Sequence, residues 1–152
     1  MRQLETRIPP PILMLGLMAA ACGIAAATPA LTAAPPFKVA LSMAAGLCGL
    51  ALNLAPKIAF RHARTTVNPL RPSATTHLIT SGIYRYTRNP MYLGHALILL
   101  GWVLYLGNAF AYAMVPVFIA FVSRFQIEPE ERALGALFPE YAEYRLQVRR
   151  WF

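Results

Sequence analysis

The sequence predicts an all-α integral membrane protein with about four transmembrane helices and a short C-terminal amphipathic helical tail. Three observations support this fold class. Hydrophobic residues make up 57% of the 152 residues and charged residues only 13%, whereas a soluble domain carries about 25% charged residues. The chain contains four long apolar runs. Its basic residues are concentrated on one side of those runs.

The four apolar runs cover residues 12–27, 39–60, 91–106 and 109–125, and a tail follows at 126–152. Each run approaches the ~20 residues that a helix needs to cross ~30 Å of hydrocarbon. Helices are expected because lipid offers no hydrogen-bonding partner to backbone groups. We therefore predict a single domain over the whole chain, in which the spans and their flanks must form any site.

Three connections and a helical tail complete this organisation. A Pro-rich connection at 28–36 joins the first two spans, a polar loop at 61–76 joins the next two, and Gly107-Asn108 forms a tight turn. In the tail, apolar residues at helical spacing predict an amphipathic helix, broken at Pro139. Beyond it, Tyr141, Tyr144 and Val148 would share one face of a second helix.

Thirteen of the fourteen basic residues lie in three segments: before the first span, around the second connection, and after the fourth span. They are Arg2, Arg7, Lys57, Arg61, Arg64, Arg71, Arg85, Arg88, Arg124, Arg132, Arg145, Arg149 and Arg150. Lys38 alone lies elsewhere. This distribution fits the positive-inside rule and disfavours nucleic-acid binding. We expect a multi-pass protein of the cytoplasmic membrane with both termini in the cytoplasm.

The first apolar run also permits a signal peptide, because Arg2 and Arg7 resemble a basic n-region and Ala25–Ala27 offers small residues for cleavage. The length of the run favours a retained span. Cys22 and Cys48 lie inside apolar runs and are interpreted as free, small apolar residues. The sequence contains no metal-binding cluster and no Rossmann-type GxGxxG.

The triplet Arg88-Asn89-Pro90 permits two compatible interpretations. Asn89 as an N-cap and Pro90 at the first helical position would begin the third span, with Arg88 reaching toward lipid phosphates. A helix N-terminus beside an arginine also binds a carboxylate well.

Three of the six acidic residues lie together at Glu128, Glu130 and Glu131. Acids next to Pro129 are typical of the first turn of a helix, where they complement the helix dipole. Carboxylates there would also recognise a cationic ligand. The tyrosines near the spans could be interfacial belt residues, Gly94 would allow close packing of spans, and His95 is interpreted as a hydrogen-bonded packing residue.

Residues 75–151 combine several short motifs in a fixed order: Leu78-Ile79, Gly82-Ile83-Tyr84, Arg88-Asn89-Pro90-Met91-Tyr92, Glu130-Glu131 and Tyr141-Ala142-Glu143-Tyr144. Together they resemble the isoprenylcysteine carboxyl methyltransferase and phospholipid methyltransferase superfamily, which are small membrane enzymes that use S-adenosylmethionine. The resemblance implies that S-adenosylmethionine is bound by Ile79, Gly82, Tyr84, Arg88, Asn89, Pro90, Tyr92 and Glu131. It also implies a catalytic role for Glu130 and an acceptor site at Tyr141 and Tyr144.

The sequence departs from the superfamily pattern at two positions. Asn89 replaces the usual histidine, so a role that needs an imidazole is in doubt. Gln126 stands where the prenylcysteine enzymes carry an arginine. We predict that Arg124, two residues earlier, takes over that catalytic role, and the change weakens the case for a prenylcysteine carboxylate as acceptor.

The function expected from this resemblance is methyl transfer to a lipophilic or small acceptor that carries a thiol, a carboxylate or an amine. The expected partners are the lipid bilayer and that acceptor. Two alternatives remain open at this stage: a non-catalytic membrane subunit that keeps the scaffold, and a membrane-embedded reductase that uses NADPH.

Overall fold

The computed structural model describes residues 5–29, 37–62 and 78–151. Most of the two predicted connections, at 30–36 and 63–77, lies outside the described residues. The described residues form helices without a strand: α1 (Pro10–Ala27), α2 (Lys38–His62), η3 (Gly82–Arg85), α3 (Pro90–Leu106), η4 (Phe110–Ala113), α4 (Met114–Val122), η5 (Ser123–Ile127), α5 (Glu128–Leu137) and α6 (Tyr141–Gln147). The predicted all-α fold is confirmed.

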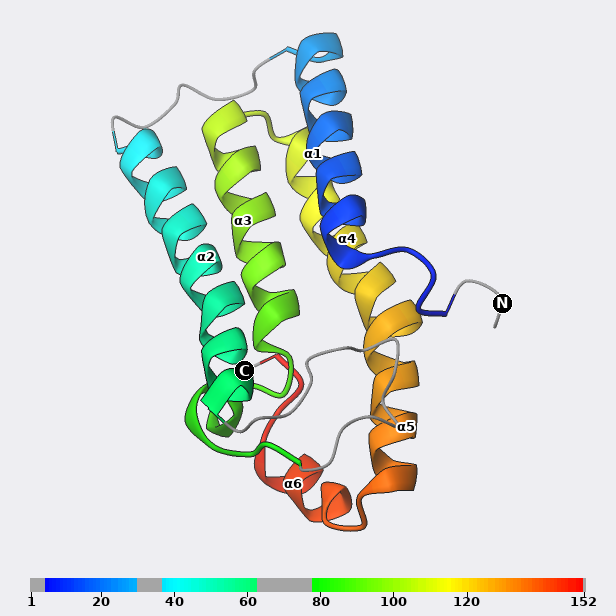
Figure 1. Cartoon of the computed structure of the whole chain (residues 1–152). Coiled ribbons are helices and arrows are strands. Elements are labelled where there is room, and N and C mark those ends of the chain that lie inside the picture. Colours follow the sequence, from blue (N-terminus) through cyan, green and yellow to red (C-terminus); the bar gives the residue numbers. More distant parts are fainter. Residues whose placement is uncertain (1–4, 30–36, 63–77, 152) are drawn as a thin grey trace.

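The four long helices pack side by side, and α6 lies at the end where α3 begins (Figure 1). Three helical stretches are long and apolar enough to cross a membrane, at Pro10–Ala27, Lys38–Lys57 and Phe110–Leu137, and the shorter apolar helix Pro90–Leu106 lies among them. These bounds agree with the predicted spans to within three residues, except at the end of the last one. The chain is therefore a helical membrane protein.

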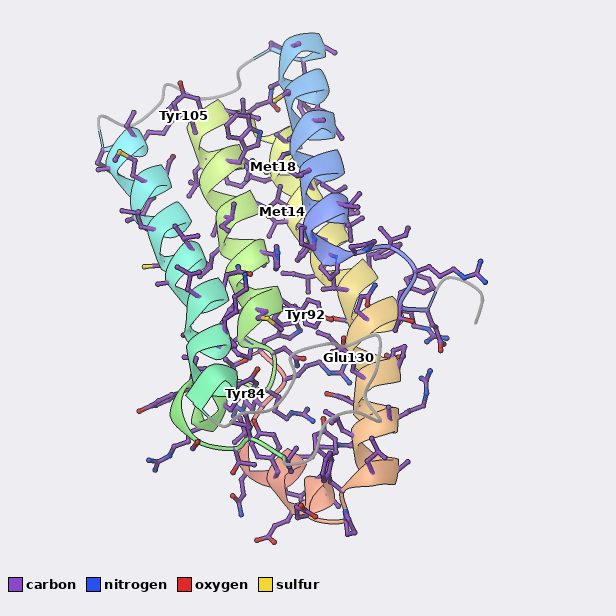
Figure 2. The ribbon with its side chains drawn as sticks, in the orientation of Figure 1. Met14, Met18, Tyr84, Tyr92, Tyr105 and Glu130 are labelled. Carbon is purple, nitrogen blue, oxygen red and sulfur yellow. The ribbon has the colours of Figure 1, made fainter. Side chains whose placement is uncertain are left out.

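Helix α3 is central because it contacts α1, α2 and α4. Leu99 and Val103 of α3 are fully buried against Phe118 and Val122 of α4. From α1, Met14 and Met18 point toward α3 (Figure 2) and pack against this core. The first apolar run thus contributes to the bundle.

Two hydrogen bonds join α1 and Thr28 after it to α3 and the turn that follows α3. The indole nitrogen of Trp102 donates to the carbonyl oxygen of Met18 at 3.2 Å. The side chain of Asn108, which is 2% exposed, donates to the Thr28 hydroxyl at 2.8 Å. Gly107, before Asn108, adopts a φ of 65°, which glycine reaches without steric cost. This confirms the predicted turn.

Helices α2 and α3 approach closely through glycine. A side chain at Gly94 would meet the Gly49 carbonyl oxygen at 2.6 Å, and one at Gly101 would meet the Ser42 carbonyl oxygen at 2.7 Å. The expectation that Gly94 serves helix packing is confirmed. His95 is half-buried, and its Nδ1 lies 2.7 Å from the Met91 carbonyl oxygen, which agrees with a packing role.

The last helical stretch is continuous from Phe110 to Leu137, so Pro129 does not begin a new helix as the sequence suggested. A π-helical turn at 123–127 accommodates the proline. Proline has no N–H to donate to the carbonyl of Phe125 in the α-helical pattern. That carbonyl accepts a hydrogen bond from the Thr6 N–H at 2.9 Å. The acidic residues therefore extend directly from the fourth span.

Candidate functional site

The candidate site lies at the end of the bundle where α3 begins, between α3, α5 and the C-terminal segment (Figure 1). Figure 2 shows Tyr92 of α3 and Glu130 of α5 facing each other, with Tyr84 near the start of α3. Glu130 and Glu131 are adjacent, but successive residues on a helix point about 100° apart. Each carboxylate consequently has its own set of partners.

Glu131 is held by two arginines. Its side chain is 10% exposed, and Arg88 approaches Oε1 at 3.1 Å. Arg150 donates twice, from Nη2 to Oε2 at 2.8 Å and from Nε to Oε1 at 3.2 Å. This two-point arrangement is the strong geometry for a guanidinium and a carboxylate, and hydrogen bonding to Glu131 raises the pKa of Arg150. Two positive charges facing one negative charge leave the cluster with a net positive charge.

Glu130 faces tyrosine instead. The Tyr92 hydroxyl, on a side chain that is almost fully buried, donates to Oε1 of Glu130 at 2.5 Å. Tyr84 lies near this pair (Figure 2), and burial, followed by the charges of Tyr144 and Glu130, raises its pKa. This part of the site pairs one carboxylate with phenol groups.

The tyrosines of the tail pack against the site and form hydrogen bonds with it. Tyr141, Tyr144 and Val148 form a buried cluster with Leu78, as the predicted shared face required. The Tyr144 hydroxyl donates to the Tyr84 carbonyl oxygen at 2.6 Å, and burial raises the Tyr144 pKa to about 12. The Tyr141 hydroxyl accepts from Nη1 of Arg88 at 3.4 Å. Both tyrosines thus join the tail to the site.

Asn89 and Pro90 occupy the predicted N-cap and first helical positions. The Asn89 side chain does not cap the helix, however. Its Nδ2 donates to the carbonyl oxygen of Arg150 at 3.0 Å. Gly82 opens η3 with a φ of 62°, which favours glycine, and Ile79 is half-buried before it.

Arg124 lies apart from these clusters. Its guanidinium pairs with Glu128 at 3.1 Å and with Glu5 at 3.6 Å. Gln126 is buried, and its side chain donates to the Ile8 carbonyl oxygen at 2.8 Å. Both residues belong to the π-helical turn, and both contact the N-terminal segment. The structure does not bring Arg124 together with Glu130.

Arg150 and Thr87 belong to the site, although no sequence motif indicates them. Thr87 is 2% exposed, its hydroxyl donates to the Arg150 carbonyl oxygen at 3.2 Å, and its oxygen accepts from the Asn89 N–H. Arg150 had been counted only with the basic residues of the tail. Its partner at Glu131 is a tertiary contact that spacing along the chain does not indicate.

A family model described as phospholipid methyltransferase matches residues 37–140, which is more than half of the chain. The chain belongs to the phospholipid methyltransferase family. A Haemophilus influenzae protein described as uncharacterized is 48% identical over 62 residues, which cover 40% of this chain and 98% of that protein. No solved structure matches the chain. The match thus places the protein in a family of membrane methyltransferases. The matched residues include α2 to α5 and both Glu130 and Glu131.

Proposed function

We propose that this family member transfers a methyl group from S-adenosylmethionine to a small or membrane-partitioned acceptor. The observation that carries the proposal is the Arg88–Glu131–Arg150 cluster, in which Arg88 and Glu131 are largely buried, beside the Tyr92–Glu130 pair. The cofactor combines a carboxylate, an ammonium and a sulfonium. The site combines an excess guanidinium charge with a second carboxylate, so the two sets of charges are complementary.

A buried atom of Arg88 supports this fit. Within the described part of the chain, Nε of Arg88 is buried and has no hydrogen-bond partner. Such a donor costs about 1–3 kcal/mol unless an acceptor reaches it. A carboxylate of the bound cofactor would supply that acceptor. Arg88 would then bind the carboxylate, while Glu131 keeps Arg88 in place.

Bound S-adenosylmethionine would supply an activated methyl group on its sulfonium. The chain would align the acceptor with that methyl group and exclude water, which accelerates a displacement through proximity. We assign Glu130 as the group that receives a proton from the acceptor. Its Oε1 is oriented by the Tyr92 hydroxyl, and Oε2 is the oxygen assigned to take the proton.

The charges around Glu130 favour a thiol or an amine over a carboxylate as acceptor. A carboxylate acceptor would need a cation beside Glu130. Arg88 and Arg150 are paired with Glu131, and Arg124 is paired with Glu5 and Glu128. A thiol or an amine, by contrast, must lose a proton, and the neighbouring carboxylate of Glu130 can accept it. Because the site adjoins the spans, we propose that this acceptor partitions into the membrane or is small enough to reach it.

The first test is calorimetric binding of S-adenosylmethionine to the purified protein in detergent. We expect Arg88→Ala and Glu131→Gln each to weaken binding by about 1.5–3 kcal/mol, the value of a charge-assisted hydrogen bond. Arg85→Ala is a matched control, because Arg85 is an exposed arginine three residues away. Wild-type affinity in both site variants would contradict the assignment, and tight binding of NADPH instead would indicate a reductase.

The acceptor is tested with S-adenosylmethionine that carries a labelled methyl group. Small thiols, phosphatidylethanolamine and prenylcysteine analogues should be compared in liposomes. We expect label on a thiol or an amine, recovered as a volatile product or in the organic phase, and its loss in Glu130→Gln. Label confined to carboxylates or to water-soluble proteins would refute the proposed acceptor class.

A further inference from the structure

The C-terminal segment joins two parts of the site that are far apart in sequence. Residues 148–151 follow α6, and we call them the C-terminal clasp. Val148 is buried with Tyr141 and Tyr144, and Trp151 packs against the core of the bundle. The clasp is thus attached at both of its ends.

Between those ends, the backbone of the clasp binds the turn that precedes α3. The Arg149 carbonyl oxygen accepts from the Arg88 N–H at 3.1 Å. The Arg150 carbonyl oxygen accepts from the Thr87 hydroxyl at 3.2 Å and from Asn89 Nδ2 at 3.0 Å. Three consecutive residues, 87–89, are therefore held by two consecutive carbonyl groups.

The side chain of Arg150, within the clasp, binds the part of the site on α5. The Arg150 guanidinium makes its two-point contact with Glu131 on α5. One residue consequently holds Asn89 through its backbone and Glu131 through its side chain. Arg88, which lies next to Asn89, meets Glu131 at 3.1 Å.

We propose that Arg150 is a positioning residue that sets the geometry of Arg88 and Glu131 through the C-terminal clasp. Only a planar guanidinium fixes both oxygens of a carboxylate at once. Arg150 fixes both carboxylate oxygens of Glu131, and Nη1 of Arg88 lies 3.1 Å from Oε1 of the carboxylate held in this way. The effect of this arrangement on cofactor affinity rests on the proposed function, but the clasp itself is a property of the protein alone.

The proposal is tested with Arg150→Ala, Arg150→Lys and the control Arg145→Ala, an exposed arginine of α6 outside the clasp. The first measurement is amide hydrogen exchange of the ligand-free protein, over peptides that contain residues 84–92. We expect Arg150→Ala to accelerate exchange there, because the clasp loses its contact with Glu131 and then holds the Arg149 carbonyl oxygen less firmly against the Arg88 N–H. Arg145→Ala should exchange like the wild type.

The second measurement is the affinity for S-adenosylmethionine. We expect Arg150→Ala to weaken binding about tenfold, as for the loss of one oriented hydrogen bond, with Arg150→Lys between it and the wild type and Arg145→Ala unchanged. Unchanged exchange in Arg150→Ala would overturn the clasp. Faster exchange with unchanged affinity would overturn its role in positioning. If the wild type binds no S-adenosylmethionine, the proposed function fails, and the exchange result alone decides whether the clasp holds residues 87–89.

Discussion

Two adjacent glutamates illustrate how environment separates chemical roles at the scale of single residues. Glu131 faces two guanidinium groups, so its negative charge is fully compensated. Glu130 faces the neutral hydroxyl of Tyr92. A charge-compensated carboxylate is suited to hold other groups in place, whereas an uncompensated one is suited to attract a cation or a proton.

The Tyr92–Glu130 pair can be tested by removing a single oxygen. Tyr92→Phe should lower the free energy of unfolding by about 1–3 kcal/mol, because a buried carboxylate loses its donor, and it should reduce methyl transfer. A double-mutant cycle with Glu130→Gln, in which stability is measured by unfolding in mixed micelles, would give the coupling energy between the two side chains. We expect this energy to exceed about 0.5 kcal/mol. Tyr86→Phe is the control, since Tyr86 is 74% exposed. Strictly additive effects would show that the two side chains do not interact.

How far sequence predicts this site depends on whether a residue's partner is local. The grouping of Glu130 with Glu131, and the position of Pro90 at a helix start, follow from neighbours in the chain and were predicted. Arg124 was expected to take over the role of the arginine that Gln126 replaces, and the structure pairs it with Glu128 and Glu5. Its partner Glu5 lies in the N-terminal segment, far from Arg124 in sequence. The motifs did not indicate Arg150, because its partner lies 19 residues away on α5.

At the scale of helices, the contact between α2 and α3 determines where the site forms. Lipid provides no hydrophobic drive for helices to associate. Close approach at glycine supplies the packing instead. Because α3 begins at the site, a displacement of α3 along α2 would also move Arg88, Asn89 and Tyr92.

This contact predicts opposite results for two glycines one turn apart on α2. A Cβ at Gly49 would lie 2.6 Å from the Gly94 carbonyl oxygen, whereas one at Gly46 would meet nothing within 4 Å. We expect Gly49→Ala to cost about 1–3 kcal/mol of unfolding free energy through overpacking. Gly46→Ala should be neutral or stabilise the protein by up to ~1 kcal/mol through helix propensity. Unfolding in mixed micelles would compare them, and equal stabilities would contradict the close contact.

At the scale of the whole molecule, exposed arginines gather at the end of the bundle that holds the candidate site. Helices α2 and α4 run opposite to α1 and α3 (Figure 1). The start of α3 and the end of the long helix formed by α4 and α5 therefore lie at the same end of the bundle. Arg85, Arg145 and Arg149 are exposed at that end. Lys38 lies at the other end, where its ammonium is 5.9 Å from the ring centroid of Tyr105. The sequence predicted that the arginines gather at one end. This prediction was possible because it needs only the order of spans and basic residues along the chain.

The positive-inside rule then predicts that the site end faces the cytoplasm. Single cysteines at Ser81 and Ala109, both exposed, would test this in a chain whose Cys22 and Cys48 are replaced by alanine. The two positions flank α3, whose 17 residues span about 25 Å. A membrane-impermeant maleimide should label position 109 in intact cells and position 81 only after the membrane is permeabilised. The reverse pattern would place the candidate site outside the cell, and labelling of both positions from one side would contradict a membrane-spanning α3.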